Sequence, residues 1–572
     1  MFRRCIPSPA LRPSFLSALR PQMKRKLSPD SARMMTTLQL DPLEKQLKYL
    51  LLDVAAHVDK TEAKEHGDQV ILRWAGGWVR DKLLGRPSHD IDVAINSMTG
   101  EVFGNELRRF CEYPENVARH NLQPEDIGRL HKIAKNPEKS KQLETATVKL
   151  FGLDVDFVNL RTETYTEDSR NPQVEFGTAE EDALRRDATV NALFYNIHTG
   201  DVEDFVGGLP DMEAGIIRTP MDPFQTFMDD PLRVLRLVRF ASRLGFSIAP
   251  STKEFMGDTR VLEALRAKIS RERVGTEVEK MLKGEHPRDA VRLIDQLGLY
   301  HTIFTDPVNL NTPQPSLEGW SAAYEFLHDS PSNIDSVYDV LVTSDEARYY
   351  AWVLACVAPF ARLPASTSAN PKKQPPVATV AAREGIKAPT KLSDLITAAV
   401  CHREQICELK SQVCSGDASE IGRDTLGMAV RGWEAKGTHW RLQVLFAILY
   451  DLVVQATAST GPGATAHTSD NLSGSPEADD AHTASTSGKV ERDWKGFLDR
   501  LQTLDLMDAP SMKPLVDGRR LMQTLDIKKP GRWMSSALDI CMAWQLRNPE
   551  ETDPAGAIEE VRQRKKELGI PI

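Results

Sequence analysis

The sequence predicts an α+β protein in which a head with a small β-sheet precedes a long helical region. Residues 90–95 and 150–165 alternate polar and apolar side chains, as half-buried strands do. From about residue 223 onward, the apolar residues recur at helical spacing instead, as in residues 290–304 and 442–455. The two patterns therefore place the strands in the first part of the chain and helices in the rest.

The composition is that of a soluble globular protein with room for several modules. Of the 572 residues, 41% are hydrophobic and 27% are charged. The net charge of −9 argues against a uniformly basic nucleic-acid coat, so any RNA contact must use local basic faces. No apolar run approaches the length of a membrane span, and the spacing of the seven cysteines is not typical of a zinc site.

Residues 1–34 are predicted to be a disordered mitochondrial presequence. The first 29 residues carry seven Arg or Lys, several Ser and no acid. Met23, Met34 and Met35 could act as later start sites that remove most of this segment. We therefore expect a mitochondrial matrix form together with cytosolic and nuclear forms.

The head is expected to span residues 41–217 and to begin with a helix at residues 41–60. Gly76 and Gly77 follow a short apolar run, and without a Cβ they let backbone N–H groups approach phosphates. Asp90 and Asp92 are two apart on the next strand, so both carboxylates point to one side. Paired carboxylates resist joint ionisation unless a cation lies between them, and hard oxygen ligands suit Mg²⁺.

A charged segment, residues 98–150, separates this strand from the next one. It shows no steady periodicity, so we expect an insertion that includes a mobile loop. The chain returns in a second alternating strand, on which Asp154 and Asp156 share one face.

The strings GGWVRDKLLG and HDIDVA, which begin at residues 76 and 89, resemble the nucleotidyltransferase superfamily of DNA polymerase β and poly(A) polymerases. They are similar to the branch that contains CCA-adding enzymes, here the fungal form, and bacterial poly(A) polymerases. This resemblance implies a polymerase-β-like head with a small mixed sheet and a two-metal Mg²⁺ site at Asp90 and Asp92. It also implies a third catalytic carboxylate, for which Asp156 is the candidate and Asp154 the alternative.

Residues 180–196 contain the same family's Arg-Arg-Asp-(x3)-Asn-Ala motif. The forked donors of Arg186 suit triphosphate oxygens. The Asp and Asn can read ribose hydroxyls, which favours NTP over dNTP. The resemblance implies this set of triphosphate- and ribose-binding residues: Gly76, Gly77, Arg80, Arg185, Arg186, Asp187 and Asn191.

The helical neck, residues 218–283, is expected to select the nucleotide base. Residues 223–246 have helical apolar spacing, with Asp229, Arg233 and Arg236 at i, i+4 and i+7, and Asp230 three before Arg233. These residues match the family's acid-Asp-x-x-Arg-x-x-Arg motif, in which Asp229 would orient Arg233.

A carboxylate beside a guanidinium can discriminate between bases. Cytosine and adenine each present an NH₂ donor beside a ring-nitrogen acceptor, whereas uracil and guanine present a carbonyl acceptor beside an N–H donor. Asp230 with Arg233 fits the first pair and leaves unpaired groups against the second. The pair therefore predicts selection of C and A.

The rest of the chain is predicted as a helical body (284–455), a disordered low-complexity linker (456–488) and a helical tail (489–572) that binds tRNA. Within the tail, Lys528, Lys529 and Arg532 surround a Pro-Gly pair that opens a helix. Such a turn can bind phosphates, although a plain surface turn is an equal alternative.

The resemblance implies template-independent addition of CCA to tRNA 3′ ends. The substrates would be CTP, ATP and the acceptor arm of tRNA, with release of pyrophosphate and without a membrane or an obligate protein partner. Poly(A) polymerases and CC-only or A-only enzymes would share these motifs, so these activities stay open. A non-catalytic tRNA-binding module is the alternative of a different class.

Overall fold

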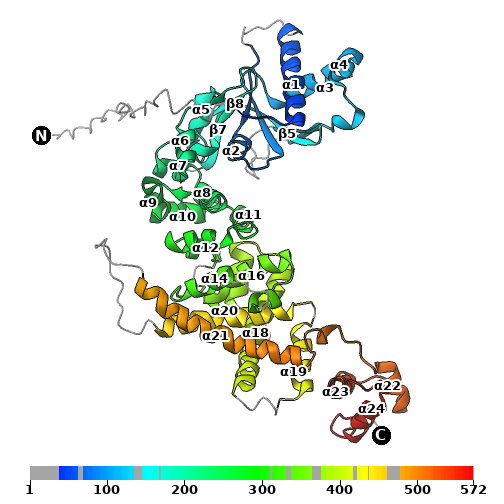
Figure 1. Ribbon diagram of the computed structural model, residues 1–572. Helices are drawn as coiled ribbons and strands as arrows, with labels where there is room; N and C mark the ends of the chain where they lie inside the picture. The colour runs from blue at the N-terminus through cyan, green and yellow to red at the C-terminus, as the bar shows by residue number, and fades with distance from the viewer. Residues whose placement is uncertain are drawn as a thin grey trace, which may run out of the picture. The chain divides into compact units, whose positions relative to one another are not determined.

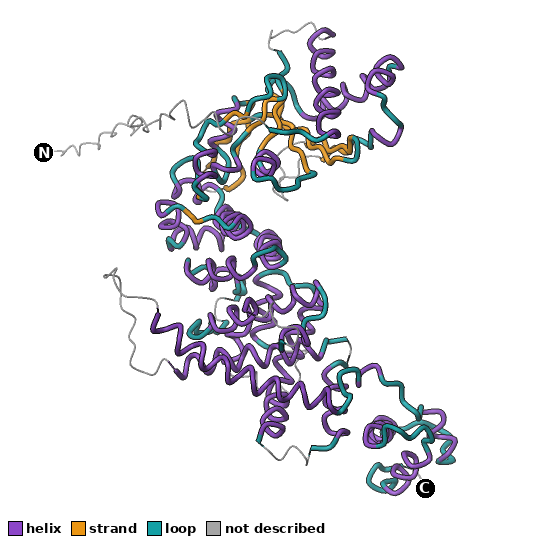
Figure 2. The backbone as a smooth tube through the Cα atoms, viewed as in Figure 1, coloured by secondary structure: helices purple, strands orange, loops and turns teal. Residues whose placement is uncertain are grey.

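The computed structural model describes residues 38–61, 69–133, 145–166, 169–309, 312–329, 336–363, 375–415, 421–435, 437–459 and 477–570. The expected presequence lies outside these residues. The chain forms two compact units (Figure 1). The first, here called the head, comprises Met1–Thr166 and Asn171–Met221, and the second comprises Glu167–Arg170 and Asp222–Ile572. The strands, orange in Figure 2, gather in the head.

The described part of the head is organised around a seven-stranded mixed sheet of order β3-β4-β5-β2-β1-β8-β9, which confirms the predicted fold class. Neighbouring strands are antiparallel except for the central pair β2 and β5, which is parallel. The strands are β1 (Leu72–Ala75), β2 (Asp90–Ile95), β3 (His131–Ile133), β4 (Thr145–Leu150), β5 (Leu153–Asn159), β8 (Phe194–Asn196) and β9 (Val202–Glu203). A separate hairpin pairs β6 (Arg161–Thr166) with β7 (Ser169–Phe176).

Helices cover and connect the strands of the head (Figure 1). The first of them confirms the helix predicted at residues 41–60. They are α1 (Pro42–Thr61), α2 (Gly77–Leu83), α3 (Gly100–Glu112), α4 (Pro114–His120), α5 (Ala179–Leu184) and α6 (Gly208–Glu213), with 3₁₀ turns η1 (Pro124–Asp126) and η3 (Thr189–Asn191) and a short final strand β10 (Ile216–Ile217).

The segment expected to be a charged insertion with a mobile loop is largely folded, so that prediction was wrong for its described part. On α3, Phe103, Leu107 and Phe110 are buried at spacings of four and three, which is one helical face. Thr99 caps the helix by accepting a hydrogen bond from the N–H of Val102. The charged residues on the other face hid this pattern. Residues 134–144 of the segment lie outside the described residues.

The second unit begins with the neck, where the single helix predicted for residues 223–246 is broken. A residue that precedes proline avoids the α region, and Asp230, before Pro231, has φ −135° and ψ 95°. Asp229 therefore ends one helix, whereas Arg233 and Arg236 lie on the next. The neck elements are α7 (Pro223–Asp229), α8 (Leu232–Leu244), β11 (Ser247–Ile248), α9 (Pro250–Met256), α10 (Thr259–Lys268) and α11 (Arg271–Leu282).

The rest of the second unit is helical in its described residues. The first part contains α12 (Pro287–Gln296), α13 (Tyr300–Ile303), α14 (Trp320–Asp329), α15 (Val337–Leu341), α16 (Asp345–Val357), η4 (Ala358–Arg362), α17 (Val377–Val380), η5 (Ala381–Gly385), α18 (Thr390–Cys414), α19 (Arg423–Trp433) and α20 (Trp440–Ser459). The second part contains α21 (Glu477–Thr503), η7 (Ala509–Ser511), α22 (Gly518–Thr524), α23 (Trp533–Arg547) and α24 (Ala555–Gln563).

Two details of this region differ from the sequence-based expectations. Residues 477–488, predicted as part of the disordered linker, are the start of α21. Residues 456–459 of that linker are the end of α20, and residues 460–476 lie outside the described residues. Among the described helices, α20 is long and apolar enough to cross a membrane, contrary to the expectation that no run reaches that length. It packs against α14, α16, α18 and α21, and a buried core helix meets the same criterion.

Candidate active site

The register of β2 against β5 brings four acids together in the head. Asp90 lies opposite Asp154, and Asp92 lies opposite Asp156. Because all four occupy alternate positions of neighbouring strands, their side chains share one face of the sheet. On the other side of β2, Ala75 of β1 lies opposite Asp92. We call the side chains of Asp90, Asp92 and Asp156 the carboxylate cluster.

Burial and mutual repulsion disfavour the ionised forms within the carboxylate cluster. Burial is the main cause that raises the pKa of Asp92 to about 6. The charge of Arg186 opposes this shift, and the charges of Asp90 and Asp156 add to it. Burial also raises the pKa of Asp90, with repulsion from Asp156 as the next cause. Joint ionisation of the cluster is therefore unfavourable in the protein alone.

The same interactions distinguish the two candidates for the third carboxylate. Asp156 repels both Asp90 and Asp92, whereas Asp154 contributes only to the shift of Asp90. The side chain of Asp154 is also more than half exposed and lies 3.4 Å from Nζ of Lys149. Asp156 is therefore the acid that faces the other two.

The carboxylate cluster fits a divalent cation. Within the described residues, its three side chains accept no hydrogen bond and form no ion pair, so no protein donor competes for their oxygens. A cation would offset the repulsion between them. No group of three or more Asp, Glu, His or Cys side chains in the described ranges is arranged as a metal cage. Water and phosphate would therefore supply the remaining ligands, as is common for Mg²⁺.

The positive charge of Arg186 acts on the carboxylate cluster, because it opposes the rise in the pKa of Asp92 that burial causes. Nε and Nη2 of Arg186 donate to Oδ2 of Asp182 at 3.1 and 3.0 Å, and its Nη1 donates to the carbonyl oxygen of Asn191 at 3.0 Å. The guanidinium also lies over the ring of Phe194, at 5.0 Å. These bonds use three of the five N–H groups of the side chain, so two can donate to an anion.

Gly76 makes room for the Arg186 guanidinium. Its φ of +71° favours glycine, and a Cβ at this position would lie 2.6 Å from Nη1 of Arg186. At Gly77, by contrast, a Cβ would lie no closer than 3.6 Å to its nearest neighbour, Nη2 of Arg80. The protein itself therefore requires glycine at position 76, while a requirement at position 77 would have to come from a ligand.

Arg80, Asp187 and Asn191 are brought together in a buried chain of hydrogen bonds. Their exposed fractions are 2%, 7% and 7%, respectively. Arg80 donates to Asp81 at 2.8 Å and to Oδ1 of Asn191. Asn191 then donates from Nδ2 to Oδ1 of Asp187 at 3.0 Å. Arg80 therefore fixes Asn191, which in turn fixes Asp187.

Asp182 is a residue of this site that sequence reasoning missed. It is 1% exposed and accepts hydrogen bonds from Arg185 and Arg186. Arg185 is held on its other side by Glu163, at 3.1 Å, and is therefore committed to acids of the head. The available signal was the spacing of three and four residues between Asp182 and the two arginines, which predicts contact at a helix end.

The predicted base-selecting residues of the neck lie around the break between α7 and α8. Asp229 accepts a hydrogen bond from Nε2 of Gln225 at 2.7 Å. The N–H of Arg233 donates to the carbonyl oxygen of Asp230 at 3.0 Å, and the side chain of Arg233 is buried. Oδ2 of Asp230 lies 3.7 Å from Nη2 of Arg273 on α11. Asp230 therefore lies in extended backbone at the break, whereas Arg233, three residues later, lies on α8.

Arg236 contacts an aromatic ring on α8. Its guanidinium lies over the ring of Phe240 at 5.4 Å, and that of Arg239 lies over the same ring at 4.4 Å. Arg239 also pairs with Glu277 of α11 at 2.6 Å. The ion pair of Arg239 with Glu277 therefore links α8 to α11, in addition to the contact between Asp230 and Arg273.

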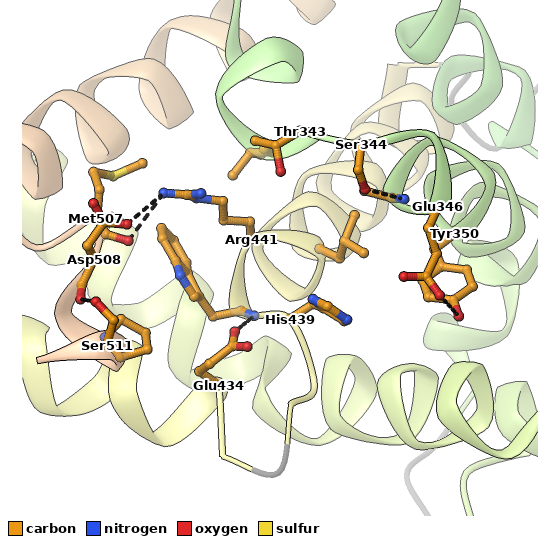
Figure 3. A pocket seen from close by; sticks show the side chains of 15 residues that line it. Thr343, Ser344, Glu346, Tyr350, Glu434, His439, Arg441, Met507, Asp508 and Ser511 are labelled. Atoms are coloured by element: carbon orange, nitrogen blue, oxygen red, sulfur yellow. Dashed lines mark hydrogen bonds and ion pairs between the residues drawn. The ribbon is translucent and has the colours of Figure 1, made fainter.

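The predicted tail residues lie apart from any described cavity. Lys528, Lys529 and Arg532 are exposed in the turn that precedes α23. A cavity of about 280 Å³ lies elsewhere in the second unit and is lined by residues that include His439 and Arg441 (Figure 3). None of the residues predicted to bind nucleotide or tRNA lines this cavity.

A mixed sheet with an acid pair on its central strand, and with an arginine beside that pair, defines a nucleotidyltransferase. Residues 72–218 match the family described as Poly A polymerase head domain, and residues 245–308 match Probable RNA and SrmB- binding site of polymerase A. The chain belongs to the CCA tRNA nucleotidyltransferase family, as the resemblance implied, because it is 37% identical to "CCA tRNA nucleotidyltransferase, mitochondrial" of Saccharomyces cerevisiae over 90% of this chain and 92% of that protein.

Two other similarities agree with this assignment. The chain is 51% identical to "Nucleotidyltransferase lcsQ" of Purpureocillium lilacinum over 98% of both proteins. It also resembles the solved "complex structure of CCA-adding enzyme with CTP", with a TM-score of 0.59 over 93% of this chain and 96% of that one. At 20% identity, this last likeness shows the fold alone.

Proposed function

We propose that this protein adds C, C and A in turn to the 3′ end of tRNA, using CTP and ATP and no nucleic-acid template. The observation that carries the proposal is the register of β2 and β5, which places Asp90, Asp92 and Asp156 on one face of the sheet in a chain of this family. A cluster of this kind suits transfer of a nucleotidyl group, because the reacting triphosphate brings both negative charge and additional metal ligands.

The head residues divide the work of the transfer reaction. The 3′-hydroxyl oxygen of tRNA attacks the α-phosphorus, which forms a new P–O bond and breaks the bond to the β-phosphate oxygen, so that pyrophosphate leaves. Asp156 accepts the proton of the hydroxyl group. Arg186 donates its two remaining N–H groups to the triphosphate. Asp187, held by Asn191, binds a ribose hydroxyl.

Asp90 and Asp92 would hold Mg²⁺, in a site that takes two ions when the nucleotide is bound. Bound there, Mg²⁺ would neutralise the charge that develops on the phosphates and on the attacking and leaving oxygens. The raised pKa values of both acids support this role, because burial and mutual repulsion disfavour their ionised forms and a bound cation would offset both effects. Arg80 and Arg185 act indirectly, since both are bound to acids or amides of the head.

The second unit supplies selection of the base and contact with tRNA. Asp230 and Arg233 bind the pairing edge shared by C and A and reject U and G. Lys528, Lys529 and Arg532 bind the tRNA backbone. We also propose a mitochondrial location, as in the name of the yeast relative, with cytosolic and nuclear forms that begin at Met23, Met34 or Met35.

Incorporation by the purified full chain tests the proposal. The substrates are tRNA transcripts that end before C, before the second C, before A, and after CCA, each with single NTPs and with CTP plus ATP. We expect addition to stop after CCA, refusal of UTP and GTP, and loss of activity in Asp90→Ala. Long A tails would indicate a poly(A) polymerase, and arrest after CC or addition of A alone would indicate a specialist. Binding of tRNA without incorporation would overturn the enzymatic assignment.

A further inference from the structure

Asp182 binds Arg185 and Arg186 through different oxygens of its carboxylate. Oδ1 accepts from Nε of Arg185 at 2.9 Å and from the backbone N–H of Arg161 at 3.3 Å. Oδ2 accepts from Nε and Nη2 of Arg186, at 3.1 and 3.0 Å. Each oxygen therefore holds a different guanidinium in a fixed orientation.

The acid is ionised in this setting. Burial alone would raise its pKa, but the charges and hydrogen bonds of Arg186 and Arg185 hold the pKa of Asp182 below its ordinary value. In the described part of the chain, Asp182 and Glu163 accept hydrogen bonds from the side chains of Arg161, Arg185 and Arg186. Loss of the Asp182 charge would leave Nε and Nη2 of the partly buried Arg186 without their carboxylate partner, while its Nη1 would keep the carbonyl oxygen of Asn191.

We infer that Asp182 is a positioning residue that holds Arg186 in the orientation in which its two remaining N–H groups can donate to the triphosphate. The inference rests on the proposed function. Besides Asp182, Asp92 is a carboxylate on which the charge of Arg186 acts. Without the Asp182 charge, the guanidinium would turn to Asp92, leave the triphosphate and compete with the cation for the same oxygens. Asp182 keeps these two charges of the site apart.

Steady-state kinetics of Asp182→Asn in the full chain tests this inference. We expect the KM for CTP and for ATP to rise about tenfold to a hundredfold, since a misplaced group costs about that much. The KM for tRNA and the preference for C and A over U and G should not change. Inorganic tripolyphosphate, as a probe of the phosphate site alone, should compete with CTP less well against the variant by a similar factor.

Glu163→Gln is the matched control. Glu163 is also buried and accepts from Arg161 at 2.8 Å and from Arg185 at 3.1 Å, but Arg186 is not among its described partners. Its KM for CTP should stay within about twofold of wild type, since no bond to Arg186 is lost. Equal effects of the two variants on the KM for CTP would overturn the inference, because they would indicate a general role in stability.

A double-variant comparison separates positioning from an independent contribution. If Asp182 acts through Arg186, the combination of Asp182→Asn with Arg186→Ala should be no slower than Arg186→Ala alone. A further loss in the double variant would overturn the inference. If Asp182→Asn does not fold, Asp182→Glu against Glu163→Asp carries the same test, because both keep the charge and move it. An inactive wild type would instead contradict the proposed function.

Discussion

At the scale of single residues, the head contains buried or half-buried acids whose ionised forms burial disfavours. Asp92 and Asp90 both have raised pKa values, and neither accepts a hydrogen bond from the described residues. Asp182 shows the opposite shift: burial would raise its pKa, but two bound arginines lower it. The protein thus neutralises the acid that orients its arginines and leaves the carboxylate cluster for a ligand to neutralise.

Replacing Asp92 with Asn should therefore abolish nucleotide addition and stabilise the metal-free protein. A native pKa of about 6 against an ordinary 3.8 corresponds to about 3 kcal/mol of destabilisation by the ionised group at neutral pH. Because the native head binds this proton more tightly than the unfolded chain, the cost is absent below the ordinary pKa and grows as the pH rises towards 6. In EDTA, calorimetry at pH 7.5 should show a Tm several degrees above wild type.

The pH dependence identifies the cause of that gain. As the pH falls from about 7.5 to about 4.5, wild-type Asp92 takes up its proton and the difference in Tm between the two proteins should shrink. An isosteric change that merely improved packing would give the same gain at both pH values. That result would count against the raised pKa of Asp92 as the source.

At the scale of elements, local patterns predicted individual strands and helices closely but not the interruptions between them. The helix expected at residues 41–60 is α1 (Pro42–Thr61), and the strand that begins at Asp90 has the predicted bounds. The neck was predicted as one helix because Asp229, Arg233 and Arg236 keep helical spacing across Pro231. The restriction on Asp230, which precedes the proline, was readable from the sequence and would have placed the break.

The pairing of β2 with β5 could not be read from the sequence. Alternation shows which side chains share a face of a strand, but it does not give the register against a strand some 60 residues away. For this reason Asp154 and Asp156 are alternatives from the sequence alone, whereas the structure shows Asp154 opposite Asp90 and Asp156 opposite Asp92. The contacts of Asp182 were local and predictable, whereas the approach of Arg273 to Asp230 was not, because it joins separate helices.

Helix α3 offers an element-scale prediction that concerns its contact with β5. A Cβ on Gly100 would lie 2.0 Å from the carbonyl oxygen of Phe157, so Gly100→Ala must push the helix away from the strand that carries Asp156. We expect a loss of about 3 kcal/mol in the free energy of unfolding and a lower rate of nucleotide addition. Thermal unfolding and single-turnover incorporation measure the two effects.

Gly104→Ala is the control in the same helix. Its Cβ would approach the flexible side chain of Leu130 at 2.9 Å, and alanine favours the helical conformation by about 0.5–1 kcal/mol. The stability of Gly104→Ala should therefore stay close to that of wild type. If the two variants lost equal stability, close packing of Gly100 against Phe157 would not be the reason.

At the scale of the whole molecule, a protein with a net charge of −9 must bind tRNA, which is also negatively charged. Part of the negative charge of the head lies in the carboxylate cluster, where a cation is expected to bind. Contacts with the tRNA backbone then depend on local basic surfaces, because long-range attraction to the whole protein is absent. The exposed turn before α23 is such a surface, with three cations in five residues, 528–532.

Replacing Lys528, Lys529 and Arg532 together with Ala should weaken tRNA binding and flatten its dependence on salt. Each cation that contacts a phosphate releases nearly one counterion, so the slope of log Kd against log salt concentration should fall by about 2 to 3. Filter binding between about 50 and 200 mM salt measures this slope. The KM for CTP should not change, because the nucleotide-binding residues lie in other elements.

The double variant Arg562→Ala with Arg564→Ala is the control for this experiment. These two arginines also lie near the end of the chain, but their guanidinium groups pair with Glu559 and Glu560 at 2.6 and 3.0 Å. Since their charges are already compensated, their removal should leave the salt slope close to that of wild type. An equal loss of slope in both variants would mean that the tail attracts tRNA through its general charge. Only a loss confined to the turn before α23 would identify that turn as the binding surface.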